Sequence, residues 1–317
     1  MTPTGTKEED MADYGDYAAY FNGEWIPYKD VRISPDDRGF MLADVVFDIG
    51  RTFNGVPFVL DRHIDRLYRS LKYLRIDCGL TPAEMTALCE EGVRRNEEHL
   101  TRVGDFSIHP FVTRGRQAGR IGDAGPATVC IGIRPVAFAT FAHYYSEGAH
   151  GVIARTRSYS SQFVDPKVKH HSRLNFVQAE LEVADVDPDA SPILLDDAGN
   201  LTEGIGYNVF LVKNGVLKTP TDRSILQGIS RGVLIELAEG LDIPFSEEDL
   251  QPYDLYTADE VFFSRTSPRI VPVSRVDNRA VGDECPGPIT RQLISAHSEM
   301  VGVDIVDQAV HFANLAE

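Results

Sequence analysis

The stretch Leu201-Thr202-Glu203-Gly204-Ile205-Gly206-Tyr207-Asn208-Val209-Phe210 decides how the second half of this chain folds. It places one acid, Glu203, at a corner between two apolar runs, Pro192–Leu195 and Asn208–Val212, that are predicted strands. Glycine at the corner permits close approach of another backbone or a ligand. A buried carboxylate there can hold a protonated ring nitrogen, although a turn glutamate is the simpler interpretation of Glu203 alone.

Further strands, tight turns and helices follow outward from this stretch. The predicted elements are turns at 197–200 and 214–215, strands at 261–263 and 270–273, and helices from Ser230 to about Gly240 and from about Thr290 to Met300. The second half is therefore predicted to mix short strands with helices.

The first half begins with antiparallel sheet. Its predicted elements are hairpins at Asn22-Gly23 and Asn54-Gly55, a helix capped by Asp61, a second helix opened by a capping box at Thr81, and strands at 106–114 and 128–133. Periodicity is lost after Pro135. We expect a loose acidic tail at 1–16, an α+β domain at 17–134, a linker at 135–150 and a second domain at 151–317.

The composition excludes several classes of protein. The 317 residues carry 48 Asp plus Glu against 31 Lys plus Arg, a net charge of -17. Such a surface repels nucleic acid and anionic lipid, and no apolar run reaches the roughly 18 residues of a membrane span. Four cysteines without short spacing indicate reduced thiols and no metal site. We expect a cytoplasmic protein without nucleic-acid or membrane partners.

The acid is gathered in blocks, whereas residues 155–173 are basic. Seven acids and no Lys or Arg lie in 182–203, and seven again in 242–260. The stretch 155–173 carries five Lys or Arg against Asp165, with His170 and His171 beside them. An anionic small molecule would bind there, and a strand with ordinary surface charges is the competing interpretation.

Three candidate residues together indicate a cofactor. Lys169 lies on a predicted strand, 163–169, with Lys167 on the same face. Ser230 stands at the mouth of a helix, where backbone N–H groups bind phosphate. A lysine amine, a carboxylate at Glu203 and a phosphate cup are the contacts that pyridoxal phosphate requires.

Four motifs in order resemble a known family. They are Asp165-Pro166-Lys167-Val168-Lys169, Leu201 to Phe210, Leu226-Gln227-Gly228-Ile229-Ser230-Arg231, and Gly287-Pro288-Ile289-Thr290. From about Tyr20 to Gly302 the chain resembles the class IV aminotransferases of pyridoxal phosphate fold type IV. The resemblance implies an N-terminal α+β lobe, a C-terminal mixed, β-barrel-like lobe, and a homodimer.

The resemblance also assigns residues to the cofactor. The Schiff-base lysine falls on Lys169, with Lys167 as the fallback, and the ring-nitrogen carboxylate on Glu203. The remaining assignments are a phosphate cup at Ile229, Ser230 and Thr266 and a phosphate-binding arginine at Arg66. On a helical wheel, however, Arg66 points away from the apolar stripe, so the pattern alone predicts a solvated side chain.

The candidate substrate-binding residues resemble more than one branch of the family. Asp37-Arg38-Gly39-Phe40 resembles the D-amino acid and (R)-amine branches, and a loop arginine that holds a carboxylate falls on Arg120, with Arg116 second. Further substrate candidates are Phe47, Arg51, Arg173, Arg265 and Ser267. Phe47 replaces the tyrosine of the D-amino acid enzymes, whereas Arg51 matches the branched-chain enzymes.

The resemblance implies a transaminase that moves an amino group between a D-amino acid or (R)-amine and a keto acid. The transfer is ping-pong and passes through an internal aldimine at Lys169. A branched-chain L-amino acid aminotransferase, an aminodeoxychorismate-type lyase and an inactive binding homologue are the alternatives.

Overall fold

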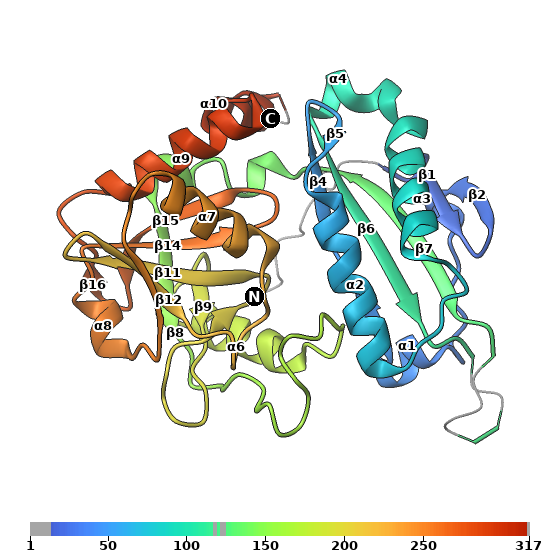
Figure 1. Ribbon diagram of the computed structural model, residues 1–317, viewed down its shortest axis with the longest axis horizontal. Helices are drawn as coiled ribbons and strands as arrows, with labels where there is room; N and C mark the ends of the chain where they lie inside the picture. The colour runs from blue at the N-terminus through green and yellow to red at the C-terminus, as the bar shows by residue number, and fades with distance from the viewer. Residues whose placement is uncertain (1–13, 117–118, 121–124, 316–317) are drawn as a thin grey trace, which may run out of the picture.

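Two sheets, each with its own helices, make up the molecule (Figure 1). The computed structural model describes residues 14–116, 119–120 and 125–315. The two lobes stand side by side, with the C-terminal helices α9 and α10 at the upper end of the second (Figure 1). The predicted two-lobe fold with mixed α and β content is confirmed.

The first lobe is built on an antiparallel sheet in the order β2-β1-β7-β6-β4-β5, with β3 paired to β6. Both predicted Asn-Gly hairpins are present, and Asn22 and Asn54 adopt the positive φ that such turns need. The strands are β1 (Ala18–Phe21), β2 (Glu24–Pro27), β3 (Val45–Phe47), β4 (Gly50–Phe53), β5 (Val56–Pro57), β6 (Phe106–Thr113) and β7 (Thr128–Pro135).

Two long helices pack against this sheet through a core that includes Ile64, Leu67 and Phe106. The lobe's helices are η2 (Tyr28–Asp30), α1 (Arg38–Leu42), α2 (Leu60–Leu74), α3 (Pro82–Arg95), η3 (Glu97–His99) and α4 (Leu100–Val103). The capping box at Thr81 is confirmed. The predicted cap at Asp61 is wrong: α2 begins at the buried Leu60, so Asp61 lies inside its first turn.

The second lobe holds a mixed sheet in the order β13-β12-β11-β14-β15-β8-β9, with β10 on β11 and β16 on β15. Its strands are β8 (Ala149–Ile153), β9 (Ser191–Ile193), β10 (Glu203–Gly204), β11 (Tyr207–Lys213), β12 (Val216–Pro220), β13 (Phe245–Glu248), β14 (Glu260–Arg265), β15 (Arg269–Val276) and β16 (Arg279–Ala280).

Helices line this sheet and connect it to the first lobe. They are η4 (Phe138–Thr140), α5 (Tyr144–Glu147), α6 (Leu174–Ala184), α7 (Ile229–Gly240), α8 (Pro252–Tyr256), α9 (Pro288–Val301) and α10 (Ile305–Asn314). Phe210 and Phe262 stack with ring centroids 5.0 Å apart and join Leu234 of α7 and Leu293 of α9 in one buried cluster. This cluster holds α7 in place, and the start of α7 carries the predicted phosphate cup.

The sequence analysis placed one strand wrongly and missed one helix. The predicted strand 163–169 is a run of turns, because Asp165 and Ser160 make local hydrogen bonds that hold the chain in tight bends. The helix α10 was not predicted, and it packs on η4, which lies in the segment expected to link the lobes. Residues 1–13 of the expected acidic tail lie outside the described residues.

Candidate active site

Lys169 lies in a pocket between the lobes, on the run of turns that replaces the predicted strand. Its backbone N–H donates to Ser70 Oγ at 3.2 Å, and its carbonyl accepts from the Phe47 N–H at 3.1 Å. The next residue, His170, forms a bridge to Val46. The first lobe therefore holds the lysine backbone, and the side chain is only 6% exposed.

The environment of the Lys169 amine disfavours its charged form. Burial lowers the pKa of Lys169 to about 7, and the positive charges of Arg66 and Arg173 add to this effect. The Nζ atom lies 4.7 Å from the centre of the Phe47 ring. Near neutral pH a substantial fraction of this amine is uncharged and able to act as a nucleophile.

Glu203 occupies the short strand β10 and lines the same pocket as Lys169. Its Oε2 atom accepts hydrogen bonds from Asn208 Nδ2 and from the Leu226 N–H, both at 3.1 Å. Burial raises the pKa of Glu203 to about 7 despite the nearby charge of Arg173. A carboxyl group in this state gains stability from a cationic partner, and a protonated ring nitrogen is one.

Arg66 is buried, so the prediction of a solvated side chain is wrong. The fully buried Asp48 carboxylate accepts from Arg66 Nε and Nη2, both at 2.8 Å, and lies 2.7 Å from His63 Nδ1. Burial opposes ionisation of Asp48, yet Arg66 and His63 hold its pKa well below its usual range. This pair draws the guanidinium inward, and Arg66 Nη1 donates to the Gln227 carbonyl at 3.0 Å.

The predicted phosphate cup is assembled around the start of α7. Gly228 caps the helix, and the first N–H groups of α7, at Ile229 and Ser230, have no acceptor within the helix. Ser230 is inside the first turn and donates its hydroxyl to the Arg265 carbonyl at 2.9 Å. A Cβ atom at residue 228 would lie 2.0 Å from Asn208 Oδ1, so this approach needs glycine.

Thr266, Arg173 and Arg265 complete the predicted lining. Both arginines lie over aromatic rings: Arg173 over Phe47 at 5.4 Å and Arg265 over Tyr207 at 5.5 Å. The positive charge of Arg173 lowers the pKa of both Lys169 and Glu203. The Lys169 Nζ atom and the Arg173 guanidinium also lie near the same Phe47 ring, so Arg173 is a neighbour of the amine.

Other predicted residues lie elsewhere. Arg51 and Ser267 do not line the pocket: Arg51 is buried behind the turn that contains Ser267 and donates to its carbonyl. Arg120 is exposed, and Arg116 makes an exposed ion pair with Asp36. The fallback lysine, Lys167, pairs with Asp165 at the surface at 3.2 Å.

Three pocket or support residues received no role from the sequence. Asp48 orients Arg66, Asn208 supports Glu203, and Ser264 lines the pocket with a buried hydroxyl that has no partner among the described residues. Asn208 and Ser264 face each other in the β11–β14 register, a pairing that no single strand pattern reveals. Within the described residues no cluster of three potential metal ligands occurs, and none of their helices is long and apolar enough to cross a membrane.

Comparison with known proteins agrees with this geometry. The family model of amino-transferase class IV matches residues 45–276. A Methanocaldococcus jannaschii protein provisionally named branched-chain-amino-acid aminotransferase is 38% identical, covering 86% of this chain and 93% of its own. The D-alanine aminotransferase of Staphylococcus haemolyticus is 31% identical, and the match covers 86% of this chain and 94% of that protein.

Solved structures give the same result. A T.th. branched-chain amino acid aminotransferase with pyridoxamine 5'-phosphate has a TM-score of 0.82 at 26% identity and covers 90% of this chain and 94% of its own. The Thermoproteus uzoniensis branched-chain aminotransferase with norvaline has a TM-score of 0.80 at 28% identity. The match covers 91% of this chain and 96% of that chain.

This chain therefore belongs to the class IV aminotransferase family. It is a transaminase that uses pyridoxal 5'-phosphate. The pocket fits this cofactor: Lys169 offers an amine of lowered pKa, Glu203 a buried carboxyl of raised pKa, and Ser264 a hydroxyl without a partner among the described residues.

The lowered pKa of Lys169 predicts its chemical reactivity. In cofactor-free protein, acylation of Lys169 should rise through about pH 7, because the reactive form is the uncharged amine. Peptide mass spectrometry of protein acylated between pH 5 and 10 measures this profile, with the surface Lys167 as the internal control. A Lys169 profile that rises only near the ordinary lysine value of about 10 would contradict the assigned environment.

Proposed function

We propose that Lys169 is the catalytic lysine and Glu203 the partner of the cofactor ring nitrogen. The observation that carries this proposal is the pair of shifted groups: a buried amine and a buried carboxyl whose pKa values both move to about 7 in one pocket. Arg66, Ile229, Ser230 and Thr266 would hold the cofactor phosphate, since all four line the same pocket.

Each residue then has one task. When bound, pyridoxal phosphate supplies a reactive carbonyl carbon and a ring that accepts electrons. Lys169 would bind it through Nζ. Once free, Nζ would move a proton from the α-carbon of the donor to the cofactor carbon in the first half of the cycle, and from the cofactor carbon to the α-carbon of the product in the second. The Glu203 carboxylate would keep a proton on the ring nitrogen. Arg66 and the first turn of α7 keep the phosphate in place.

We further propose that the donor carries a carboxylate. Arg173 and Arg265 line the pocket, and neither has a carboxylate partner among the ion pairs of the described residues. A guanidinium binds a carboxylate through two parallel hydrogen bonds. This favours an α-amino acid over an amine without a carboxylate.

Two branches of substrate remain as candidates. A branched-chain L-amino acid has the stronger support, because the 38% identical relative and the structural neighbours described above bear that name. A D-amino acid, with the related (R)-amines, is the second candidate, because the chain also matches D-alanine aminotransferases at 31% identity. The loop residue behind this candidate, Arg120, is exposed.

Trapping tests the catalytic lysine. The protein with pyridoxal phosphate should show a visible absorption band, and borohydride should fix the cofactor on the Lys169 peptide. Lys169→Ala should abolish both trapping and transfer, whereas Lys167→Ala, the surface control, should retain them. Cofactor trapped on any lysine other than Lys169 would refute the assignment.

A donor panel tests the substrate branch. Both enantiomers of leucine, alanine and 1-phenylethylamine are supplied with a keto acid, and keto product is measured. L-leucine should be the best donor and 1-phenylethylamine the poorest, by at least about tenfold, the effect of one charge-assisted hydrogen bond. Preference for D-alanine would select the second candidate. Release of pyruvate without any acceptor would indicate the lyase alternative instead.

We also propose a homodimer located in the cytoplasm. The short helix α1 presents Phe40, Met41 and Leu42 to solvent, and Phe163 is 84% exposed. Contiguous apolar side chains of this kind mark interaction sites. All four cysteines are free, as expected in a reducing compartment.

The dimer predicts a mass of twice 35.1 kDa in size-exclusion chromatography with light scattering. Met41→Glu should shift the population toward the monomer, because it buries a charge in the interface. Val56→Glu, at a strand position that is even more exposed than Met41, is the control and should leave the population unchanged. A wild-type protein of single-chain mass would overturn the proposal.

A further inference from the structure

Arg62, Arg66 and Arg69 lie on one side of α2, the side that faces the second lobe. They are four and three residues apart, the spacing at which side chains of a helix are neighbours. Arg66, the buried one, donates to the Gln227 carbonyl just before the cap of α7. Arg62 and Arg69, one turn before it and one turn after it, line a cavity next to this contact.

The cavity has a volume of about 230 Å³ and lies between α2 and the first turn of α7. Arg62 and Arg69 of α2 and Arg231 of α7 line it, and none of the three lines the cofactor pocket. Gly228 and Ile229 line both, so the cavity and the cofactor pocket are adjacent. The volume is below the roughly 300 Å³ at which pockets for drug-sized ligands begin, so the cavity suits a small ion.

Positive charge at this cavity is only partly compensated. Arg62 pairs with Glu236 at 2.7 Å and Arg231 with Glu247 at 2.8 Å, but neither glutamate lines the cavity. Arg69 is exposed and makes no ion pair with any described residue. Like charges three or four residues apart on a helix repel each other. An anion bound between these arginines would offset the repulsion.

The lining contains one acid within the described residues, Asp222. Its carboxylate accepts a hydrogen bond from Gln227 Nε2 at 2.8 Å, so a neutral side chain holds it. The lining therefore carries three positive charges against one negative charge, in a protein whose total charge is -17. A local excess of cations on an acidic protein indicates a site for an anion.

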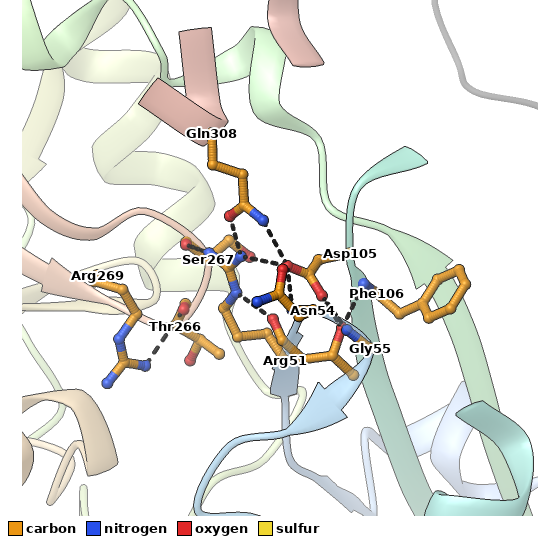
Figure 2. Close-up of polar contacts among 10 residues, drawn as sticks. Arg51, Asn54, Gly55, Asp105, Phe106, Thr266, Ser267, Arg269 and Gln308 are labelled. Carbon is orange, nitrogen blue, oxygen red and sulfur yellow. Dashed lines mark hydrogen bonds and ion pairs between the residues drawn. The ribbon is translucent and has the colours of Figure 1, made fainter. Parts of the chain in front are cut away.

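A second junction between the lobes has no such excess. Arg51 Nη2, on β4, lies 3.5 Å from the Asp105 carboxylate and donates to Gln308 Oε1 of α10 at 3.1 Å. Gln308 Nε2 in turn donates to Asp105 at 2.8 Å (Figure 2). The arginine at this junction is therefore balanced by an acid of its own, whereas Arg69 is not.

We propose that the cavity is a second oxyanion site, which takes a small ion of the phosphate class between Arg62 and Arg69 of the first lobe and Arg231 of the second. Guanidinium groups bind phosphate oxygens through paired hydrogen bonds. The bound ion bridges α2 and α7 and stabilises the contact between the lobes beside the cofactor pocket. The site is independent of the proposed function, because none of its three arginines has a task there.

Calorimetric titration tests this site on protein whose cofactor has been fixed by borohydride, so that the phosphate position of the cofactor is already filled. Inorganic phosphate is titrated in one arm and glycerol 3-phosphate, a small phosphate ester, in the other. One ion per chain should bind, and Arg69→Gln should weaken binding by about tenfold, because it removes a charge-assisted hydrogen bond. The arm with the higher affinity identifies whether the ion is free phosphate or an ester.

A variant of opposite sign and two controls separate binding from folding. Asp222→Asn removes the negative charge of the lining and should strengthen phosphate binding by about two- to fivefold, the size of an exposed charge interaction. Arg94→Gln is the matched control, because Arg94 is an exposed arginine of the same lobe that does not line the cavity. Gln308→Leu alters the second junction only. Both controls should keep the wild-type affinity.

The possible outcomes are distinct. Absence of phosphate binding to the wild-type protein would overturn the site, as would equal affinities in the wild type, Arg69→Gln and Asp222→Asn. Equal losses in Arg69→Gln and Arg94→Gln would also overturn it, because net charge alone would then account for the binding. Failure of borohydride to fix any cofactor would instead refute the proposed function, and the same titrations of the untreated protein would then decide on the oxyanion site.

Discussion

The buried ion pair between Asp48 and Arg66 holds the arginine that joins α2 of the first lobe to the start of α7 in the second. Asp48 is fully buried and takes hydrogen bonds from Arg66, His63 and the Ile49 N–H. Removing one partner of such a pair leaves an unpaired charge, which costs about 3–5 kcal/mol. Arg66 binds Asp48 through Nε and Nη2, and its remaining nitrogen, Nη1, donates to the Gln227 carbonyl immediately before α7. The start of α7 is thereby tied to α2 of the other lobe.

The pocket chemistry depends on this tie. Arg66 and Arg173 are the two positive charges that assist burial in lowering the pKa of Lys169. The pKa of Glu203, which lines the same pocket, is raised by burial. Pockets in which titratable groups are moved toward neutral pH by burial and by charged neighbours are typical of catalytic sites. One structural contact thus joins the lobes and helps to prepare the amine.

The sequence allowed the fold to be predicted, and the residues proposed for the cofactor line one pocket, but the contacts that hold them there were not predicted. Local signals were sufficient for the Asn-Gly hairpins and the Thr81 capping box, because these depend on a few adjacent residues. They failed for Arg66, whose burial follows from Asp48 eighteen residues away. They also failed for Arg51, whose partners Ser267 and Gln308 lie more than 200 residues along the chain. Tertiary partners of this kind have no signature in a helical wheel or a strand pattern.

The division of the pocket between the lobes has a mechanical consequence. The backbone of Lys169 is bonded to Ser70 and Phe47 of the first lobe, whereas Glu203 belongs to the sheet of the second. The amine and the carboxyl are therefore fixed to different lobes, and the distance between them depends on how the lobes are docked. A small rotation of one lobe would change the reactive spacing without altering any bond inside either lobe, so stiffness of the joint is itself a determinant of rate.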